Sequence, residues 1–400
     1  MGILKIIFSL LILSFPIAEI GRVQFSNGVA FSVNDVILSV LIAFWIIYHF
    51  LIKKKIKKNT LTKPILIFIC VALISLILNI FQLSIMSFLV SFLYLLRWTM
   101  YASLFFIVKE FDKEFKSKIP YLMLVSGVMV VLAGYIQYFF YPSLRNLYYL
   151  GWDEHLYRMF SSFLDPNFAG TFFVIFFIFI LGLMYKYFKN NLLNKAVVLG
   201  ILNIFVLIAV YLTYSRSTLL MLIISVVTYL ILIGKKKLIL VSVLLMVLLV
   251  FFLPKSFKTE GTNFLRIVSS EARLDSAYQA FSIFEKNPLF GVGFNAYRYA
   301  QNRYSGLNNM YWQTTHSGAG TDNSFLFVLA TTGIIGLISY LYLLFSIFAF
   351  AKMNLKNNVF SLILFSSLAG LIFNSFFINS LFYVFILEWI WIVSSLIENK

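Results

Sequence analysis

The sequence is dominated by long apolar runs separated by short polar connections. A helix crosses the hydrocarbon core of a bilayer with roughly 20 apolar residues, because the core is about 30 Å thick and each residue adds about 1.5 Å. Hydrophobic residues make up 61% of the chain and charged residues only 12%, which is outside the range of soluble domains. The chain is therefore predicted to be an all-α polytopic membrane protein.

The apolar runs predict about twelve transmembrane helices. No Pro-, Gly- or Ser-rich linker divides them, so residues 1–400 are predicted to form a single integral membrane domain. One long polar loop, residues 254–322, separates the ninth helix from the tenth and is predicted to carry short helices. The runs lie near residues 3–20, 33–52, 64–82, 85–108, 120–141, 167–187, 195–214, 217–234, 237–253, 323–350, 358–377 and 380–397.

Lysines at the ends of the runs predict the orientation, because Lys and Arg near span ends stay preferentially on the cytoplasmic side. The lysine-rich connections alternate with connections that lack this excess. They are predicted to face the cytoplasm together with both termini, so the 254–322 loop faces outward. These lysines and anionic membrane lipid explain the net charge of +17, and no nucleic-acid partner is expected. The lysine-rich connections are residues 53–63, 109–118, 186–195, 235–237 and 352–356.

Arginine has the opposite distribution. A planar guanidinium holds phosphate in a fixed geometry through paired hydrogen bonds, so outward arginines favour a lipid-linked diphosphate as ligand. Contacts with phospholipid head groups or helix ends are the favoured interpretation for Arg22, Arg145, Arg298 and Arg303 taken singly. Eight of the nine arginines lie outward: Arg22, Arg145, Arg158, Arg216, Arg266, Arg273, Arg298 and Arg303.

Four motifs between about residues 150 and 345 carry a family resemblance. Arg158 precedes residues 165–170 (DPNFAG), and residues 213–217 (TYSRS) form a tight turn between two runs. Residues 273–281 (RLDSAYQAF) lead into residues 287–294 (NPLFGVGF), and residues 322–326 (DNSFL) precede residues 333–337 (GIIGL). In this order and on this side of the membrane, the motifs resemble the O-antigen ligase and O-antigen polymerase (Wzy) superfamily of bacterial envelope glycan enzymes.

The resemblance implies transfer of a glycan from an undecaprenyl-diphosphate carrier to an acceptor. The reaction would take place at the outer face of the bacterial cytoplasmic membrane, by a metal-independent, inverting displacement. Asp322, Arg273 and Arg216 are the expected catalytic residues, the arginines stabilising the leaving diphosphate. The expected substrate-binding residues are Arg158, Arg266, Asn323, Gly291, Gly293, Arg97 and His316.

No cofactor or metal is expected. The three histidines, His49, His155 and His316, form no ligand-like pair, and the chain lacks an Asp-x-Asp pair of the kind that holds Mg²⁺ beside a nucleotide sugar.

Asp322 departs from the family pattern, in which His-Asn enters the following span. A carboxylate can act as the general base if burial raises its pKa toward neutrality. Helix capping by Thr321, Asp322 or Asn323 is an equally good explanation, and His316 is a fallback base. The aspartate favours a polymerase, whose acceptor is a new lipid-linked repeat unit, over a ligase, whose acceptor is a lipid A core sugar.

Residues 269–284 are predicted to form an amphipathic helix, with Leu274, Tyr278 and Phe281 on one stripe and Ser269 or Ser270 as its cap. Lying along the membrane surface, it would hold Arg273 at head-group depth. The helix ends by residues 287–288, after which the two glycines of the motif allow either a simple turn or close approach to substrate.

Arg97 and Glu388 are the two charges predicted to lie in the middle of spans, where charges are costly and tend to be paired or functional. An ion pair between the fourth and last helices is the favoured interpretation. The alternative is that Arg97 binds a carrier phosphate.

Two other function classes remain open. A twelve-span flippase or transporter would concentrate polar residues near the bilayer midplane and show inverted repeats, whereas polar residues here collect in one outer loop. An inactive scaffold of an envelope glycan complex fits the missing histidine. A flippase and a chain-length regulator are expected partners of a polymerase.

Overall fold

The computed structural model describes residues 1–25, 28–52, 59–251, 259–263, 268–305, 320–356 and 358–397. Helices make up 80% of the structure, which agrees with the predicted all-α polytopic membrane protein. Within this part of the chain the only strands are β1 (Val23–Gln24) and β2 (Ala30–Phe31), an antiparallel hairpin in which Val23 faces Phe31.

A helix lies in each of the twelve predicted runs. Seven stretches of the described chain are long and apolar enough to cross a membrane, while α3, α8, α9, α13 and α14 are apolar but shorter. Twelve crossings and the orientation therefore stay predictions. The α-helices are α1 (Gly2–Ser14), α2 (Val33–Ile52), α3 (Thr62–Leu78), α4 (Ile85–Glu110), α5 (Lys113–Phe140), α6 (Pro166–Lys189), α7 (Leu193–Leu212), α8 (Arg216–Leu232), α9 (Lys237–Phe251), α10 (Val268–Lys286), α11 (Tyr297–Ser305), α12 (Ser324–Met353), α13 (Val359–Asn374) and α14 (Val384–Ser395). Short 3₁₀ helices are η1 (Phe15–Gly21), η2 (Ile80–Gln82), η3 (Arg145–Leu150), η4 (Ser161–Phe163), η5 (Glu260–Thr262) and η6 (Ser380–Phe382).

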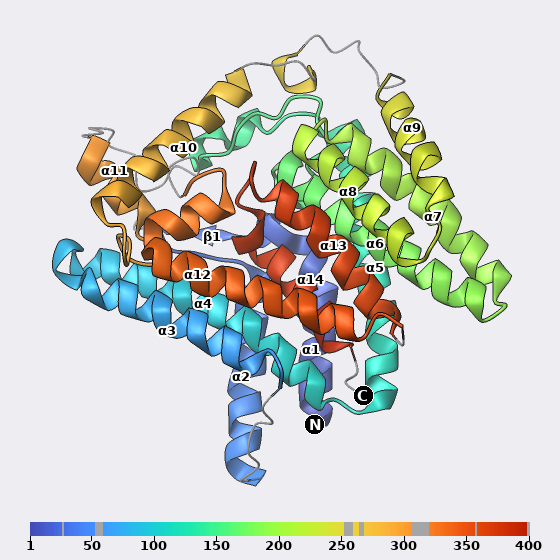
Figure 1. The fold of residues 1–400 in the computed structure, drawn as a ribbon, viewed down its shortest axis with the longest axis horizontal. Helices are drawn as coiled ribbons and strands as arrows, with labels where there is room; N and C mark the ends of the chain where they lie inside the picture. Colours follow the sequence, from blue (N-terminus) through green and yellow to red (C-terminus); the bar gives the residue numbers. More distant parts are fainter. Residues whose placement is uncertain are drawn as a thin grey trace.

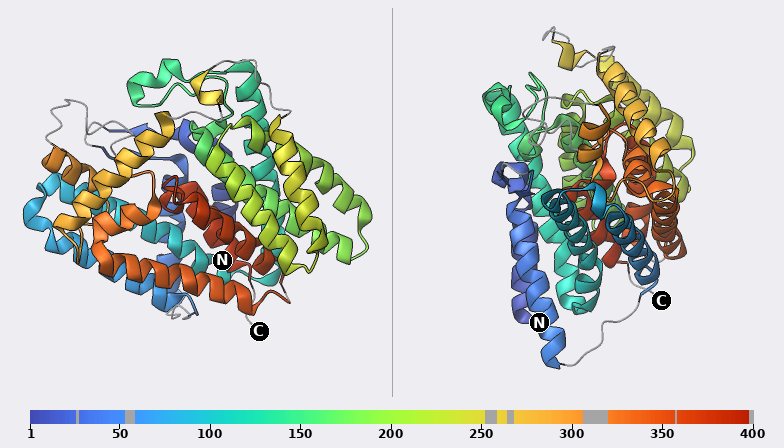
Figure 2. Two further views of the ribbon diagram at one scale, coloured as in Figure 1. Left: turned by 45° about the horizontal axis from the view of Figure 1, so that its top comes forward. Right: turned by 90° about the vertical axis from the view of Figure 1, so that its left-hand side faces the viewer.

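α6 is the central helix of the bundle. Most of its residues are buried, and it packs against α7, α8 and α13. In Figure 1 both termini lie at the lower edge, whereas α10 and α11 lie at the upper left. The right-hand view of Figure 2 again places α10 at the end of the molecule away from the N-terminus. The two α-helices described within the 254–322 loop, α10 and α11, thus lie at the end of the molecule away from the N-terminus.

α12 is broken at Gly333, where φ is +68° and ψ is −169°. The chain that follows α10 docks against this break and replaces the backbone partners that an unbroken helix would supply. As a result, residues 287–293 act as a wedge that ties the polar loop to a membrane helix. Its hydrogen bonds run from Val292 N to Ala330 O (3.2 Å), Gly293 N to Thr331 O (2.9 Å), Ile334 N to Pro288 O (2.9 Å) and Ile335 N to Leu289 O (3.3 Å).

α3 secures the wedge from the other side. The hydroxyl of Ser75 donates to Thr331 O (2.9 Å), and the Asn79 side-chain amide donates to Gly291 O (3.0 Å). A Cβ on Gly291, which has φ +65°, would lie 2.4 Å from the Thr331 carbonyl carbon. Glycine is therefore required at this position by both its backbone angle and its close packing.

α10 agrees with the predicted amphipathic helix, with one correction. It begins at Val268, so Ser269 and Ser270 lie inside its first turn rather than at its cap. The stripe of Leu274, Tyr278 and Phe281 is exposed, at 58%, 73% and 48%. The opposite face, with Ala280 and Ile283, is buried against α12.

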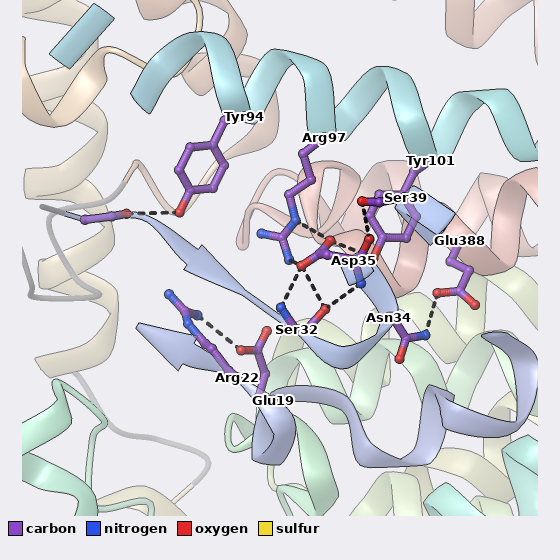
Figure 3. Close-up of polar contacts among 11 residues, drawn as sticks. Glu19, Arg22, Ser32, Asn34, Asp35, Ser39, Tyr94, Arg97, Tyr101 and Glu388 are labelled. Atoms are coloured by element: carbon purple, nitrogen blue, oxygen red, sulfur yellow. Dashed lines mark hydrogen bonds and ion pairs between the residues drawn. The ribbon is translucent and has the colours of Figure 1, made fainter. Parts of the chain in front are cut away.

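The predicted ion pair between Arg97 and Glu388 is wrong. Figure 3 shows that Arg97 is bound instead by Asp35 in the first turn of α2, through hydrogen bonds of 2.7 and 2.6 Å. Tyr101 donates to the same carboxylate, and Glu388 accepts from the Asn34 side chain at 2.9 Å. The prediction failed because Asp35 lies near a span end in the sequence, whereas the packing of α2 on α4 places it opposite Arg97.

Candidate functional site

Four charged side chains from four distant segments come within electrostatic range of one another. Arg273 of α10 interacts with Asp322, Arg216 and Asp165, and Asp322 interacts in turn with Arg273 and Asp165. The fold thus brings the three expected catalytic residues, Arg216, Arg273 and Asp322, into one place. Asp165 is the fourth member.

Asp165 owes its position to helix capping. It precedes Pro166, the first residue of α6, and its Oδ1 accepts from the backbone N–H groups of Asn167 (2.6 Å) and Phe168 (3.2 Å). The other carboxylate oxygen, Oδ2, lies 3.8 Å from Nε2 of His155. A negative charge is therefore held rigidly beside the arginines.

Arg216 is the first residue of α8 and follows a tight turn in which Tyr214 has φ +51°. The N-terminus of a helix carries a partial positive charge and backbone N–H groups without helical partners. The guanidinium of Arg216 adds a full positive charge there. This end of α8 is therefore suited to an anionic ligand.

Arg158 braces the turn that presents Arg216. Its side chain is buried, with Nε donating to Thr213 O (2.9 Å) and Nη2 donating to Oδ1 of Asn167 (3.3 Å). The Ser215 hydroxyl donates to the same Asn167 oxygen at 2.9 Å. Arg158 thereby joins the TYSRS turn to the start of α6, and direct substrate binding by Arg158 stays a prediction.

Ser276 ties α10 to the entrance of α12. Its hydroxyl donates to Oγ1 of Thr321 (3.1 Å) and accepts from the backbone N–H of Asp322 (3.3 Å). Ser276 lies three residues after Arg273, so both side chains occupy the same face of α10. This contact sets Arg273 beside Asp322.

Asn323, and not Asp322, caps α12. Its side-chain oxygen accepts from the backbone N–H groups of Phe325 (2.8 Å) and Leu326 (3.0 Å). The carboxylate of Asp322 is consequently not engaged in capping the helix. Asn323 itself is explained by helix capping, and its predicted contact with substrate stays a prediction.

Burial and neighbouring charges shift the pKa values of Asp322 and Arg273. Partial burial raises the pKa of Asp322, the nearby negative charges of Asp165 and Asp153 add to this effect, and Arg273 opposes it. Burial lowers the pKa of Arg273, as does the positive charge of Arg216, while Asp322 opposes the shift. Asp322 therefore holds a proton more readily than an ordinary aspartate, as a general base at neutral pH requires.

The remaining predicted site residues have structural contacts of their own or fall outside the described residues. Gly291 and Gly293 are buried in the wedge at the break of α12, and their predicted contact with substrate stays a prediction. Arg97 is bound by Asp35. Arg266 and His316 fall outside the described residues.

The sequence predictions assigned no role to Asp165, His155 or Ser276. Asp165 is the first residue of the DPNFAG motif, and an aspartate directly before a proline is a signal for a helix N-cap. Nothing in the sequence signals the contact of Ser276 with Asp322. Among the described residues no group of three or more His, Cys, Asp or Glu side chains is placed to hold a metal ion.

Part of the chain is similar to a known protein family. Residues 201–341 match the family model described as O-antigen ligase (Wzy_C). This match includes Arg216, Arg273 and Asp322. No curated protein matches the chain. The resemblance to the O-antigen ligase and polymerase superfamily is thereby confirmed over residues 201–341.

Proposed function

We propose that this protein is a bacterial envelope polysaccharide polymerase. It transfers a glycan from an undecaprenyl-diphosphate carrier to a lipid-linked repeat unit at the outer face of the cytoplasmic membrane, with inversion at the sugar carbon. The observation that carries the proposal is the convergence of Arg216, Arg273 and Asp322 from three separate segments. The family match over residues 201–341 supports a glycosyltransferase-like enzyme with lipid-linked glycan substrates.

Asp322 acts as the general base in this proposal. It removes the proton of the acceptor hydroxyl while that oxygen forms a bond to C1 of the donor sugar. The bond between C1 and the diphosphate oxygen breaks on the opposite face, and the diphosphate leaves with the electron pair. The raised pKa of Asp322 matches this role, because a base is most effective when its pKa lies near the working pH.

Arg216 and Arg273 stabilise the negative charge that develops on the leaving diphosphate. Both are held in place before the reaction, Arg216 by the turn that Arg158 braces and Arg273 by the contact of Ser276 with residues 321–322. Preorganised donors aimed at developing charge are commonly the largest single contribution to catalysis. The N-terminus of α8 supports the same charge.

The exposed stripe of α10 fits a position at the membrane surface. Leu274, Tyr278 and Phe281 would contact the outer leaflet, which sets the neighbouring Arg273 at the depth of a carrier diphosphate. This placement distinguishes the proposal from a transporter, in which polar groups gather near the bilayer midplane.

A ligase that transfers the glycan to lipid A core, or to another acceptor, is the second candidate. It would use the same base and the same arginines, and the family model that matches residues 201–341 is described as O-antigen ligase. The aspartate at position 322 favours the polymerase, because the resembled ligases carry histidine there.

The size profile of carrier-linked and surface glycan tests the proposal. Cells that lack this protein would be complemented with wild type, with Arg273→Gln, or with Arg303→Gln as a matched control. Arg303 is an exposed arginine of the same loop that donates to Gln82. We expect Arg273→Gln to insert normally and leave only single repeat units, while Arg303→Gln restores long chains. Long chains retained on the carrier would identify the ligase, and wild-type chains with Arg273→Gln would refute both enzymes.

A further inference from the structure

The side chain of Asn167, in the first turn of α6, is held by two donors at once. Its Oδ1 accepts from Nη2 of Arg158 at 3.3 Å and from the hydroxyl of Ser215 at 2.9 Å. Ser215 directly precedes Arg216, the first residue of α8. The amide of Asn167 is therefore fixed beside the start of the helix that presents a proposed catalytic arginine.

These two bonds decide which way the amide points. A guanidinium can only donate, so the oxygen of Asn167 must face Arg158, and a flipped amide would bring two donors together. Nδ2 then points away from Arg158. It is not buried, and it has no hydrogen-bond partner among the described residues. The backbone is held as well, since Asn167 N donates to Oδ1 of Asp165 (2.6 Å) and Thr171 Oγ1 donates to Asn167 O (2.8 Å). Nδ2 is thus a preorganised donor that the fold leaves unused.

Close packing of α6 on α8 places this donor next to Arg216. A Cβ on Gly170 would lie 2.6 Å from Oγ1 of Thr218 and 3.1 Å from Oγ1 of Thr213, so glycine lets the first turns of the two helices approach. Asn167 lies in the first turn of α6, and Arg216 begins α8. Both residues consequently serve the same end of the bundle.

We propose that Nδ2 of Asn167 donates a hydrogen bond to the diphosphate of the lipid carrier, beside Arg216. The inference rests on the proposed function, in which Arg216 and Arg273 stabilise the leaving diphosphate. A diphosphate presents more acceptor oxygens than one guanidinium fork fills. A neutral amide adds a donor there without a further positive charge, and its fixed position costs no reorganisation during the reaction.

Asn167→Asp tests this contact because it keeps an acceptor oxygen for Arg158 and Ser215 but removes the donor. The full chain would be placed in nanodiscs of phosphatidylcholine, which carries no net charge, and titrated with geranyl diphosphate by calorimetry. We expect Kd to rise at least tenfold, since hydrogen bonds to charged groups are the stronger ones. Asn146→Asp is the matched control, an exposed asparagine of an outward segment whose oxygen accepts from Tyr141. The control should bind like wild type, and wild-type binding by Asn167→Asp would overturn the proposal.

Two further comparisons separate a substrate contact from a purely structural role. Ser215→Ala removes one bond to the Asn167 oxygen and leaves the donor in place, so Asn167→Ala should weaken binding more than Ser215→Ala does. Equal effects would overturn the proposal, and this comparison remains available if Asn167→Asp unfolds. Repulsion without contact is screened in about 1 M sodium chloride, where the Debye length is about 3 Å. A loss with Asn167→Asp that disappears in this salt would also overturn the contact.

The outcomes distinguish this inference from the proposed function. Wild-type binding by both Arg216→Gln and Arg273→Gln, with weakened binding by Asn167→Asp, would contradict the proposed donor site and leave the contact at Asn167 standing. Geranyl diphosphate carries no sugar, so unchanged binding with a raised KM for the glycan-linked donor would overturn the diphosphate assignment in favour of a sugar hydroxyl. Displacement of the probe by phosphatidylglycerol in wild type but not in Asn167→Asp would assign the contact to phospholipid head groups instead.

Discussion

Replacing Gly333 by alanine should loosen the wedge of residues 287–293 from α12. The φ of +68° and ψ of −169° at Gly333 lie in a region that is essentially restricted to glycine, and another residue held there costs about 1–3 kcal/mol. A Cβ would also lie 2.2 Å from the carbonyl oxygen of Leu289. That atom belongs to the backbone, so the wedge itself must move.

Movement of the wedge removes further stabilisation. The hydrogen bonds from Ile334 N to Pro288 O (2.9 Å) and from Ile335 N to Leu289 O (3.3 Å) both pass beside the new methyl group. Each contributes about 0.5–1.5 kcal/mol. Together with the backbone strain, the loss is about 2–6 kcal/mol, or roughly 30-fold to more than 10⁴-fold in the folding equilibrium.

Thermal unfolding of the purified chain in detergent, followed by tryptophan fluorescence, measures this loss. Glycan transfer should fall as well, because the wedge directly follows α10 and so positions Arg273. Gly200→Ala is the matched control, since its Cβ would meet only the flexible end of Met184, at 3.3 Å. Glycine and alanine differ by about 1 kcal/mol in a helix, so the control should melt near wild type. If Gly333→Ala melts and transfers glycan like the control, the break does not depend on glycine.

Three further results are expected. Asp322→Asn should reduce the transfer rate roughly 10²- to 10⁴-fold without loss of fold. The wild-type rate should rise with pH through the raised pKa of Asp322, because the protonated carboxyl cannot accept the proton of the acceptor hydroxyl. A rate that falls with pH in this range would contradict the assignment of Asp322 as the base. Asp165→Asn keeps a good helix cap but removes a negative charge, so the pKa of Asp322 should fall. The acidic side of the pH–rate profile should then move to lower pH, and an unchanged profile would exclude the electrostatic interaction between Asp165 and Asp322. Asp35→Asn leaves Arg97 unpaired and should cost about 3–5 kcal/mol, measured as a lower melting temperature; a melting temperature equal to wild type would show that the pair does not stabilise the fold.

The predicted positions of the helices agree with the structure because membrane insertion depends on local hydrophobicity. A run such as residues 167–187 is apolar whatever surrounds it, and it forms α6. The same locality explains the amphipathic α10, whose exposed stripe was visible in the spacing of Leu274, Tyr278 and Phe281.

Contacts between distant segments could not be predicted in this way. The sequence predicted Glu388 as the partner of Arg97, whereas the packing of α2 on α4 selects Asp35. The wedge at Gly333 has the same origin. Its Asn-Pro and Gly-x-Gly pattern is typical of a surface turn, but Gly291 is required by the backbone of α12, which a Cβ at this position would meet.

Hydrophobicity, arginine content and short motifs are local properties, so the class of protein, the polar loop and the residue types of the candidate site could be predicted from the sequence. Which of those residues act together depends on the packing of the helices. Packing placed Arg216, Arg273 and Asp322 in one cluster with Asp165, assigned the helix cap to Asn323, and paired Arg97 with Asp35. These outcomes depend on how the helices pack, and a pKa or an ion pair depends on distances that only packing sets.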